Sequence, residues 1–286
     1  MPRGVPNAGF RAARRGSDAA ERIAAVKVSY APEKRETDEQ IEQRIADRFE
    51  ILDVLTEATT VGNSRALIVS GPAGLGKSFS VEKHLAAWDP NELQHTIVKG
   101  YVRATGLVKL LYQFRHPNNV IVFDDADSIF FDDVSLNLLK AVCDTTERRR
   151  VSWLSEGKLV DDDSAELIPR HFDFEGSIIF ITNYDFDAMI DKGHKLAPHL
   201  QAMVSRAHYV DLAMKSRRDY LVRIRQVIKQ GLLGDLGFEA RSDVISFIES
   251  NHESLRELSL RMALKLGALR KQGGNWERVA RITCCK

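Results

Sequence analysis

Short apolar segments recur along the first three quarters of the chain and alternate with stretches of helical periodicity. Five of them lie at 66–69, 95–98, 120–123, 178–181 and 208–212. Segment 120–123 is apolar without interruption, as expected for a strand of a parallel sheet that helices cover on both faces. The pattern predicts an α/β fold with a doubly wound, parallel five-stranded sheet.

Helical periodicity marks both sides of this strand-bearing region. Before it, apolar residues recur every three or four positions from Ile41 to Leu55, and Thr37 with Gln40 resembles a capping box. From Ser216 onward the strand signal disappears and helical spacing continues. We therefore expect a basic N-terminal segment at 1–36, an α/β domain at 37–214 and a smaller all-helical domain at 215–286 with a basic tail.

Composition adds a cellular expectation. The 286 residues are 44% hydrophobic and 28% charged, and no uncharged apolar stretch reaches the ~20 residues of a membrane span. We expect a soluble, cytoplasmic protein with no membrane partner. The net charge is +1, yet residues 1–35 carry eight Lys or Arg against three acidic residues. Such basic ends either hold a polyanion or are solvated tails.

The cysteines predict neither disulfides nor a zinc site. Cys143, Cys284 and Cys285 form no CxxC pair, and His194 and His199 have no further ligand cluster beside them.

The most specific motif follows the first apolar segment. The residues Gly71, Pro72, Ala73, Gly74, Leu75, Gly76, Lys77 and Ser78 match G-x-x-x-x-G-K-[ST]. Glycines let backbone N–H groups approach a phosphate, and the following helix points its positive end at the same anion. We expect this P-loop (71–78), with Phe79 after it, to bind a nucleoside triphosphate. The α/β domain at 37–214 would then be a nucleotide-binding domain with 215–286 as its lid, and the only metal we expect is the one that accompanies the nucleotide. Lys77 would reach the β- and γ-phosphates, and the Ser78 hydroxyl would bind Mg²⁺.

Polar residues end two other predicted strands. Asp124, 47 residues after Lys77, follows 120–123, where a carboxylate that helps hold Mg²⁺ is expected. Asp125 stands where a water-activating carboxylate would be, or else caps the loop. Asn183 follows 178–181, and the carboxyl ends of parallel strands meet at one ligand-binding edge.

The order and spacing of these motifs resemble the AAA+ ATPases, P-loop NTPases in which 71–78 would be Walker A and 120–125 Walker B. The resemblance covers about residues 37–270 and is most like AAA+ proteins of tailed bacteriophages, as in 121–127 and 174–183. It implies ATP and Mg²⁺ as cofactors and Asn183 as the sensor 1 residue that orients the attacking water. It also implies Arg206 as the arginine finger, with Arg217 and Arg218 as rivals, and Arg261 as the sensor 2 residue that contacts nucleotide, with Arg256 as its rival.

One position departs from the family pattern, because Asp125 stands where the family usually has Glu. A carboxylate one methylene shorter makes ATP binding a firmer expectation than rapid turnover. An arginine finger acts on the neighbouring subunit's γ-phosphate, so the resemblance implies a homo-oligomer, with a hexameric ring as its expected form. Lys77, Asp125, Asn183 and Arg206 are the expected catalytic residues.

Two segments bear on the substrate. Loop 99–103 (Lys-Gly-Tyr-Val-Arg) resembles the pore loop of protein unfoldases, and its basic residues would equally suit a nucleic-acid backbone with Tyr101 stacked on a base. Tyr101 could instead be the last core residue of the strand. Segment 148–160, with three arginines at its start, suggests a hairpin around Glu156 and Gly157.

These features leave three functions open. The first is a ring-forming ATPase that remodels or translocates along nucleic acid or nucleoprotein, in phage-type DNA metabolism. The second is a protein unfoldase or chaperone that acts through Tyr101. The third is a nucleotide-gated assembly switch with little turnover, which Asp125 suggests.

Overall fold

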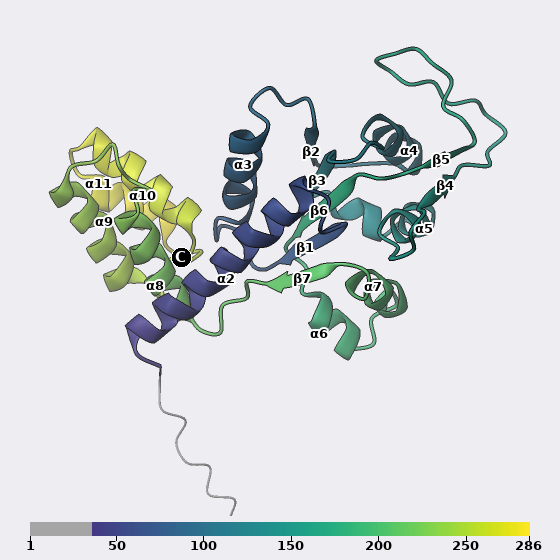
Figure 1. Cartoon of the computed structure of the whole chain (residues 1–286). Helices are drawn as coiled ribbons and strands as arrows, with labels where there is room; N and C mark the ends of the chain where they lie inside the picture. Colours follow the sequence, from purple (N-terminus) through teal and green to yellow (C-terminus); the bar gives the residue numbers. More distant parts are fainter. Residues whose placement is uncertain (1–35) are drawn as a thin grey trace, which may run out of the picture. The chain divides into compact units, whose positions relative to one another are not determined.

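The structure is a computed structural model that describes residues 36–286, so the segment predicted at 1–36 falls outside it but for Glu36. The sheet-bearing part contains α2 (Asp38–Thr60), β1 (Ala66–Ser70), α3 (Lys77–Trp88), β2 (His95–Lys99), α4 (Ala104–Gln113), β3 (Val120–Asp124), η1 (Asp127–Phe130), α5 (Asp133–Val142), β4 (Arg150–Ser152), β5 (His171–Asp173), β6 (Ser177–Thr182), α6 (Phe186–Asp191), α7 (Ala197–Val204) and β7 (His208–Asp211). The helices α8 (Arg217–Lys229), α9 (Phe238–Asn251), α10 (Leu260–Gln272) and α11 (Trp276–Cys284) follow (Figure 1).

The main sheet of the described residues has five strands in the order β2-β3-β6-β1-β7. Every neighbouring pair is parallel. Strands adjacent in the sheet are mostly not adjacent in the chain, so helices make the connections. The arrangement confirms the predicted doubly wound, parallel five-stranded sheet and is consistent with the P-loop AAA+ fold.

Alternate side chains of each central strand enter two separate cores. On β1, Ala66 and Ile68 join a cluster with buried residues of α4, α5 and α7, while Leu67 and Val69 join a cluster with α2 and α3. The uninterrupted apolar character of these strands follows, because both faces are buried.

The strand register brings the predicted functional positions to one edge. Ser70 at the end of β1 lies beside Thr182 of β6, and Asp124 at the end of β3 lies beside Ile181. The P-loop after Ser70, the Asp124–Asp125 pair and Asn183 therefore leave the sheet as neighbours. The sequence prediction that these strand ends meet is confirmed.

The helices α8 to α11 enclose a third apolar cluster that includes Ile228, Val244, Leu266 and Ala280. Two of these helices begin with a capping serine: Ser216 accepts a hydrogen bond from the Asp219 backbone, and Ser259 accepts one from the Met262 backbone. The division at 214/215 into two domains stays a prediction, because residues Asp38–Lys286 form a single compact unit.

The hairpin predicted around Glu156 and Gly157 exists, but its turn lies further along the chain. Strands β4 and β5 pair antiparallel, and Val160 bridges Leu167, so the chain reverses within 161–166. Asp161 forms this turn, because its Oδ1 accepts from the backbone N–H groups of Asp163 and Ser164. Glu156 and Gly157 lie on the first limb of the hairpin, and the turn prediction was wrong.

Among residues 36–286, no helix is long and apolar enough to cross a membrane.

Candidate functional site

The P-loop has a backbone that only glycine adopts easily. Gly71, Gly74 and Gly76 have φ angles of 150°, 75° and 98°. At Gly74 an added Cβ would lie 2.7 Å from Cβ of Ser259, so the loop also packs closely against the start of α10. The backbone N–H of Leu260 donates to the Gly74 carbonyl at 2.8 Å. The loop is thus held between α3 and α10.

The helix that leaves the loop has an open N-terminus. Gly76 takes the N-cap position of α3 and offers no side-chain cap. The first N–H groups of a helix have no partner within the helix, and an anion satisfies them and meets the positive end of the helix dipole. This geometry suits a phosphate.

Lys77 is buried at the foot of the loop. Its Nζ donates to the carbonyls of Gly71 and Pro72, at 2.5 and 2.9 Å, and to Oδ1 of Asn183 at 3.0 Å. Burial lowers the pKa of Lys77 to about 8, although the charges of Asp125 and Asp124 act in the opposite direction. A buried ammonium whose pKa is lowered in this way is stabilised when an anion binds beside it.

Asp124 lies where a magnesium ligand was predicted. Its Oδ1 accepts a hydrogen bond from the Ser78 hydroxyl at 2.9 Å, so the two oxygen donors from α3 and β3 are adjacent. Its Oδ2 lies 3.2 Å from Nζ of Lys99, which also pairs with Glu82 at 2.7 Å. No group of three or more His, Cys, Asp or Glu among the described residues could hold a metal. The Ser78–Asp124 pair fits Mg²⁺, which uses one or two carboxylates together with phosphate oxygens.

Asp125 and Asn183 are joined directly. Nδ2 of Asn183 donates to Oδ1 of Asp125 at 2.7 Å, so Asn183 links the P-loop lysine to the second aspartate. Asp125 has φ 52°, a left-handed conformation that Asp and Asn adopt far more readily than Glu. The backbone at this position thus gives a physical reason for an aspartate at residue 125.

The sequence prediction assigned no role to Asp127, which the structure adds to this cluster. Its Oδ1 is buried and has no hydrogen-bond partner in the described part of the chain. Burial raises the pKa of Asp127, and the charges of Asp125 and Asp124 raise it further. In the sequence, Asp127 follows Asp125 by two positions, just after the buried strand β3. This position was the signal that could have identified it.

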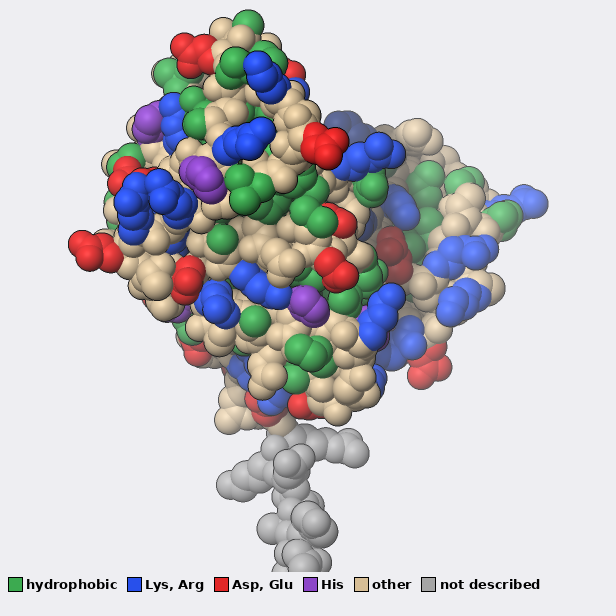
Figure 2. Space-filling model, turned by 90° about the vertical axis from the view of Figure 1, so that its right-hand side faces the viewer, with side chains coloured by type: hydrophobic (Ala, Val, Ile, Leu, Met, Phe, Trp, Pro, Cys, Tyr) green, Lys and Arg blue, Asp and Glu red, His purple; other side chains and the backbone are tan. Residues whose placement is uncertain are grey.

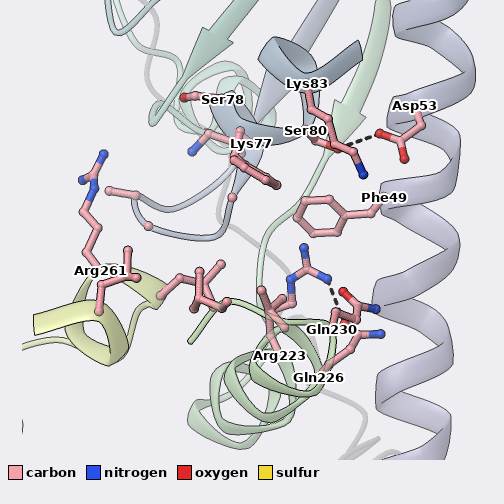
Figure 3. Close-up of a pocket in the computed structure, with 18 of the residues that line it drawn as sticks. Phe49, Asp53, Lys77, Ser78, Ser80, Lys83, Arg223, Gln226, Gln230 and Arg261 are labelled. Carbon is pink, nitrogen blue, oxygen red and sulfur yellow. Dashed lines mark hydrogen bonds between the residues drawn. The ribbon is translucent and has the colours of Figure 1, made fainter. Parts of the chain in front are cut away.

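A pocket of about 780 Å³ opens beside the P-loop (Figure 3). Of the predicted binding residues, Ala73, Gly74, Gly76, Lys77, Ser78, Phe79 and Arg261 line it, together with Asp125 and Asn183. Gly71, Pro72 and Leu75 do not line it, and Leu75 packs into the core cluster of α2 and α3. Arg261 enters from the first turn of α10, as labelled in Figure 3.

The far wall of the pocket comes from α2 and α8, and the sequence analysis missed it. Phe49, Asp53, Arg223, Gln226 and Gln230 are its labelled members in Figure 3. Arg223 is buried although it is charged, and it lies among the apolar residues Val222, Ile224 and Ile228 on the buried part of α8. A charged residue within a buried stripe was the signal that could have identified it.

The structure does not bring Arg206 to this pocket. Its Nη1 donates to the Ala202 carbonyl at 2.8 Å, and its Nε lies 3.8 Å from Asp144. Of its rivals, Arg217 donates to the His252 carbonyl and Arg218 pairs with Asp38. The arginine-finger role stays a prediction for all three, as do the catalytic and binding roles of the other site residues.

The chain is similar, at low sequence identity, to solved structures of NtrX from Brucella abortus. NtrX from Brucella abortus in complex with ATP has 15% sequence identity and a TM-score of 0.42, with 79% of this chain and 52% of that chain covered. NtrX in complex with ADP has 15% identity and a TM-score of 0.40, with 82% and 50% covered. The chain spans about half the length of these NtrX chains.

Comparison of sequences gives a nearer relative. No protein-family model matches the chain. An uncharacterized 36.7 kDa protein from Enterobacteria phage T4, encoded in the nrdC-mobD intergenic region, is 38% identical over 257 residues, which are 87% of this chain and 77% of that protein. The chain belongs to the same family as this phage T4 protein.

Proposed function

We propose that this chain is an AAA+-type ATPase that binds ATP with Mg²⁺ at the P-loop and hydrolyses it. One observation carries the proposal: the Ser78–Asp124 contact of 2.9 Å and the chain of hydrogen bonds from Lys77 through Asn183 to Asp125 meet beside a pocket of nucleotide size. A chance glycine-rich turn would not bring both sets of groups to the same sheet edge.

Each polar group has a chemical task in this proposal. Lys77 and the open N-terminus of α3 bind the β- and γ-phosphates. Ser78 and Asp124 would hold Mg²⁺, which neutralises charge on the phosphate oxygens. Asn183 orients the Asp125 carboxylate, and Asp125 accepts a hydrogen bond from the attacking water and so aligns it. Arg261 contributes a further positive charge at the α10 side of the pocket.

The proposed assembly is a homo-oligomeric ring in which Arg206 completes a neighbouring site. The position of Arg206 outside the pocket of its own chain fits a group that acts in trans. A finger supplied in trans is worth roughly 10³–10⁵ in rate, so turnover would depend on assembly. A hexamer is the ring size we propose from the family resemblance.

Nucleic acid or nucleoprotein is the proposed substrate of the ring. Tyr101 is 74% exposed at the end of β2, so it is not the core residue that the sequence left possible, and Arg103 beside it is exposed. An exposed aromatic and a cation together suit base stacking and phosphate contact. Tyr101 also supports the second candidate, a protein unfoldase, because an aromatic can grip an extended polypeptide.

Other basic residues give this substrate less support. Arg149 is buried and donates to the carbonyls of Val142 and Gly176, and Arg148 pairs with Asp173. On the face of the molecule that Figure 2 presents, Lys and Arg side chains are interspersed with acidic ones rather than gathered into one band. Loop 99–103 is therefore the segment to test.

The function is tested in two stages. Calorimetric titration of ATP with Mg²⁺ into the chain and its Lys77→Ala variant tests binding, and we expect binding only by the unaltered chain. Phosphate release is then measured with single-stranded DNA, duplex DNA or unfolded protein, with Tyr101→Ala as the variant. Stimulation by DNA that salt weakens favours the first function, stimulation by unfolded protein favours the second, and ATP-dependent assembly without phosphate release favours the switch.

A further inference from the structure

The pocket wall opposite the P-loop contains a guanidinium stacked on an aromatic ring. Cζ of Arg223 on α8 lies 3.6 Å from the ring centroid of Phe49 on α2. The same guanidinium reaches toward the P-loop, because a Cβ added to Gly76 would lie 3.8 Å from Nη2 of Arg223. Figure 3 shows both side chains on the wall across from Lys77 and Ser78.

The hydrogen bonds of Arg223 are incomplete. The residue is 8% exposed, and burial lowers its pKa to about 10, against the charge of Asp53. Nη1 donates to Oε1 of Gln226 at 2.8 Å, but Nε is buried without a partner, and Arg223 forms no ion pair within residues 36–286. The protein covers Nε, whereas Nη2 is not among the buried unpaired atoms and has no hydrogen-bond partner in the described part of the chain, so Nη2 is the donor that a ligand in the pocket can satisfy. A buried cation is costly unless it finds such an acceptor.

The surroundings indicate which part of a nucleotide supplies it. The P-loop and α3 account for the phosphates, and the pocket continues from them past apolar residues of α8 and α10, among them Val227, Leu260 and Leu264. Glu50 and Asp53 line this part of the pocket together with Lys83 and Arg223, so the acidic and basic charges are balanced there and give no excess of positive charge for a further phosphate. The ligand group that fits here must pack against apolar side chains and must also offer a hydrogen-bond acceptor to Arg223. A flat, apolar heterocycle with acceptor atoms on its edge meets both requirements.

We propose that Arg223, backed by Phe49, is the specificity-determining residue that recognises the nucleobase of the bound nucleoside triphosphate. Its Nη2, the guanidinium nitrogen nearest the P-loop, contacts a ring nitrogen or carbonyl oxygen of the base, as arginine does with base edges in nucleic acids. Gln226 fixes the orientation of the Arg223 guanidinium group, because it accepts a hydrogen bond from Nη1 and its own amide donates to the Glu42 carbonyl at 3.4 Å. The inference rests on the proposed function, because it requires a nucleotide at the P-loop.

The test separates the base from the phosphates. The affinities of ATP and of inorganic tripolyphosphate, each with Mg²⁺, are measured by calorimetry on the full chain and on Arg223→Met, Arg223→Lys and Lys229→Met. Lys229 is a matched control, because it is an exposed cation on α8 outside the pocket. Thermal unfolding checks that each variant is folded, and Arg223→Lys retains the charge while it removes the planar fork.

We expect the unaltered chain to bind ATP at least about tenfold more tightly than tripolyphosphate, and both Arg223 variants to lose about tenfold for ATP with a change within about twofold for tripolyphosphate. Lys229→Met leaves both affinities unchanged. Equal losses of affinity for the two ligands would show that Arg223 contacts a phosphate, and an unchanged ATP affinity would show that Arg223 only packs against Phe49. Either result overturns this inference and leaves the proposed function standing. If the unaltered chain binds neither ligand, the proposed function fails with it.

Discussion

Nδ2 of Asn183 lies 2.7 Å from Oδ1 of Asp125, and the other side of the same amide accepts a hydrogen bond from Lys77. One amide therefore fixes the relative positions of the phosphate-binding lysine and the proposed water-positioning carboxylate. Because the amide oxygen faces Lys77 and the amide nitrogen faces Asp125, neither contact survives if the amide is removed.

Asn183→Ala is expected to reduce phosphate release by about 10² while ATP affinity falls by no more than about tenfold, since it removes positioning rather than charge. Steady-state phosphate release and calorimetry measure the two quantities. Asn137→Ala is the control, because Asn137 is exposed on α5 away from the site. If Asn183→Ala turns over at the rate of the control, the amide does not position Asp125.

Substitutions of Asp125 separate chemistry from backbone strain. Asp125→Asn retains a side chain that tolerates φ 52° and removes the charge, so we expect ATP binding to persist and phosphate release to fall by at least about 10². Asp125→Glu places a longer side chain in the left-handed region and is expected to lower the free energy of unfolding by about 1 kcal/mol. Chemical denaturation of the unaltered chain and both variants measures the free energy of unfolding. An Asp125→Glu variant that is as stable as the unaltered chain, or more stable, would contradict the proposed strain.

The lowered pKa of Lys77 predicts how ATP affinity depends on pH. Lys77 is protonated below its folded-state pKa of about 8 and becomes neutral as the pH rises through that value. A phosphate binds the ammonium, so affinity is expected to be constant below about pH 7 to 8 and to fall by up to about tenfold per unit above it. Calorimetry from about pH 7 to about pH 9.5 at constant salt checks this. A flat profile would show that Lys77 stays charged throughout.

The contact between the P-loop and α10 predicts a stability difference between two glycines. Gly74→Ala and Gly193→Ala place alanine at similar φ angles of 75° and 65°, but only at Gly74 does the new Cβ meet another residue, Ser259, at 2.7 Å. We expect Gly74→Ala to be less stable than Gly193→Ala by about 1–3 kcal/mol, the cost of overpacking. Denaturant titrations of both variants measure the difference, and equal stabilities would mean that α10 does not press on the loop.

Lys99 is expected to oppose metal binding. Its ammonium lies 3.2 Å from Asp124, on the carboxylate that would ligate Mg²⁺. Lys99→Met removes a repelling charge, so the Mg²⁺ concentration that half-saturates ATP binding should fall by roughly threefold to tenfold. The control is Lys109→Met, which removes a lysine that pairs with Asp162 at the hairpin turn. A higher Mg²⁺ requirement in Lys99→Met would show that Lys99 instead supports the site.

The sequence predicted the features that depend on local pattern. The P-loop, the strand that ends in Asp124 and the strand before Asn183 each have a short signature, and parallel strands bring their ends together by a general rule. The wall formed by Phe49 and Arg223 could not be predicted in this way. These residues are far apart in sequence, and Phe49 fits the apolar stripe of a helix equally well whether it faces a core or a pocket.

The wrong hairpin turn has a similar cause. Glu156 and Gly157 look like a turn by residue type, but the hydrogen bonds of Asp161 determine where the chain reverses. Tyr101 likewise could not be assigned to core or surface from its place at the end of an apolar strand. Its exposure depends on the sheet edge that β2 occupies.

The central claim is that the P-loop site binds and hydrolyses ATP, and steady-state phosphate release over a protein-concentration series tests it most directly. The chain, Lys77→Ala and Arg206→Ala are compared with ATP and Mg²⁺. We expect release by the unaltered chain to rise faster than linearly with concentration, and release by both variants to stay at background, with ATP binding retained only in Arg206→Ala. Equal release by the unaltered chain and Lys77→Ala, or none from the unaltered chain at any concentration, would contradict the claim.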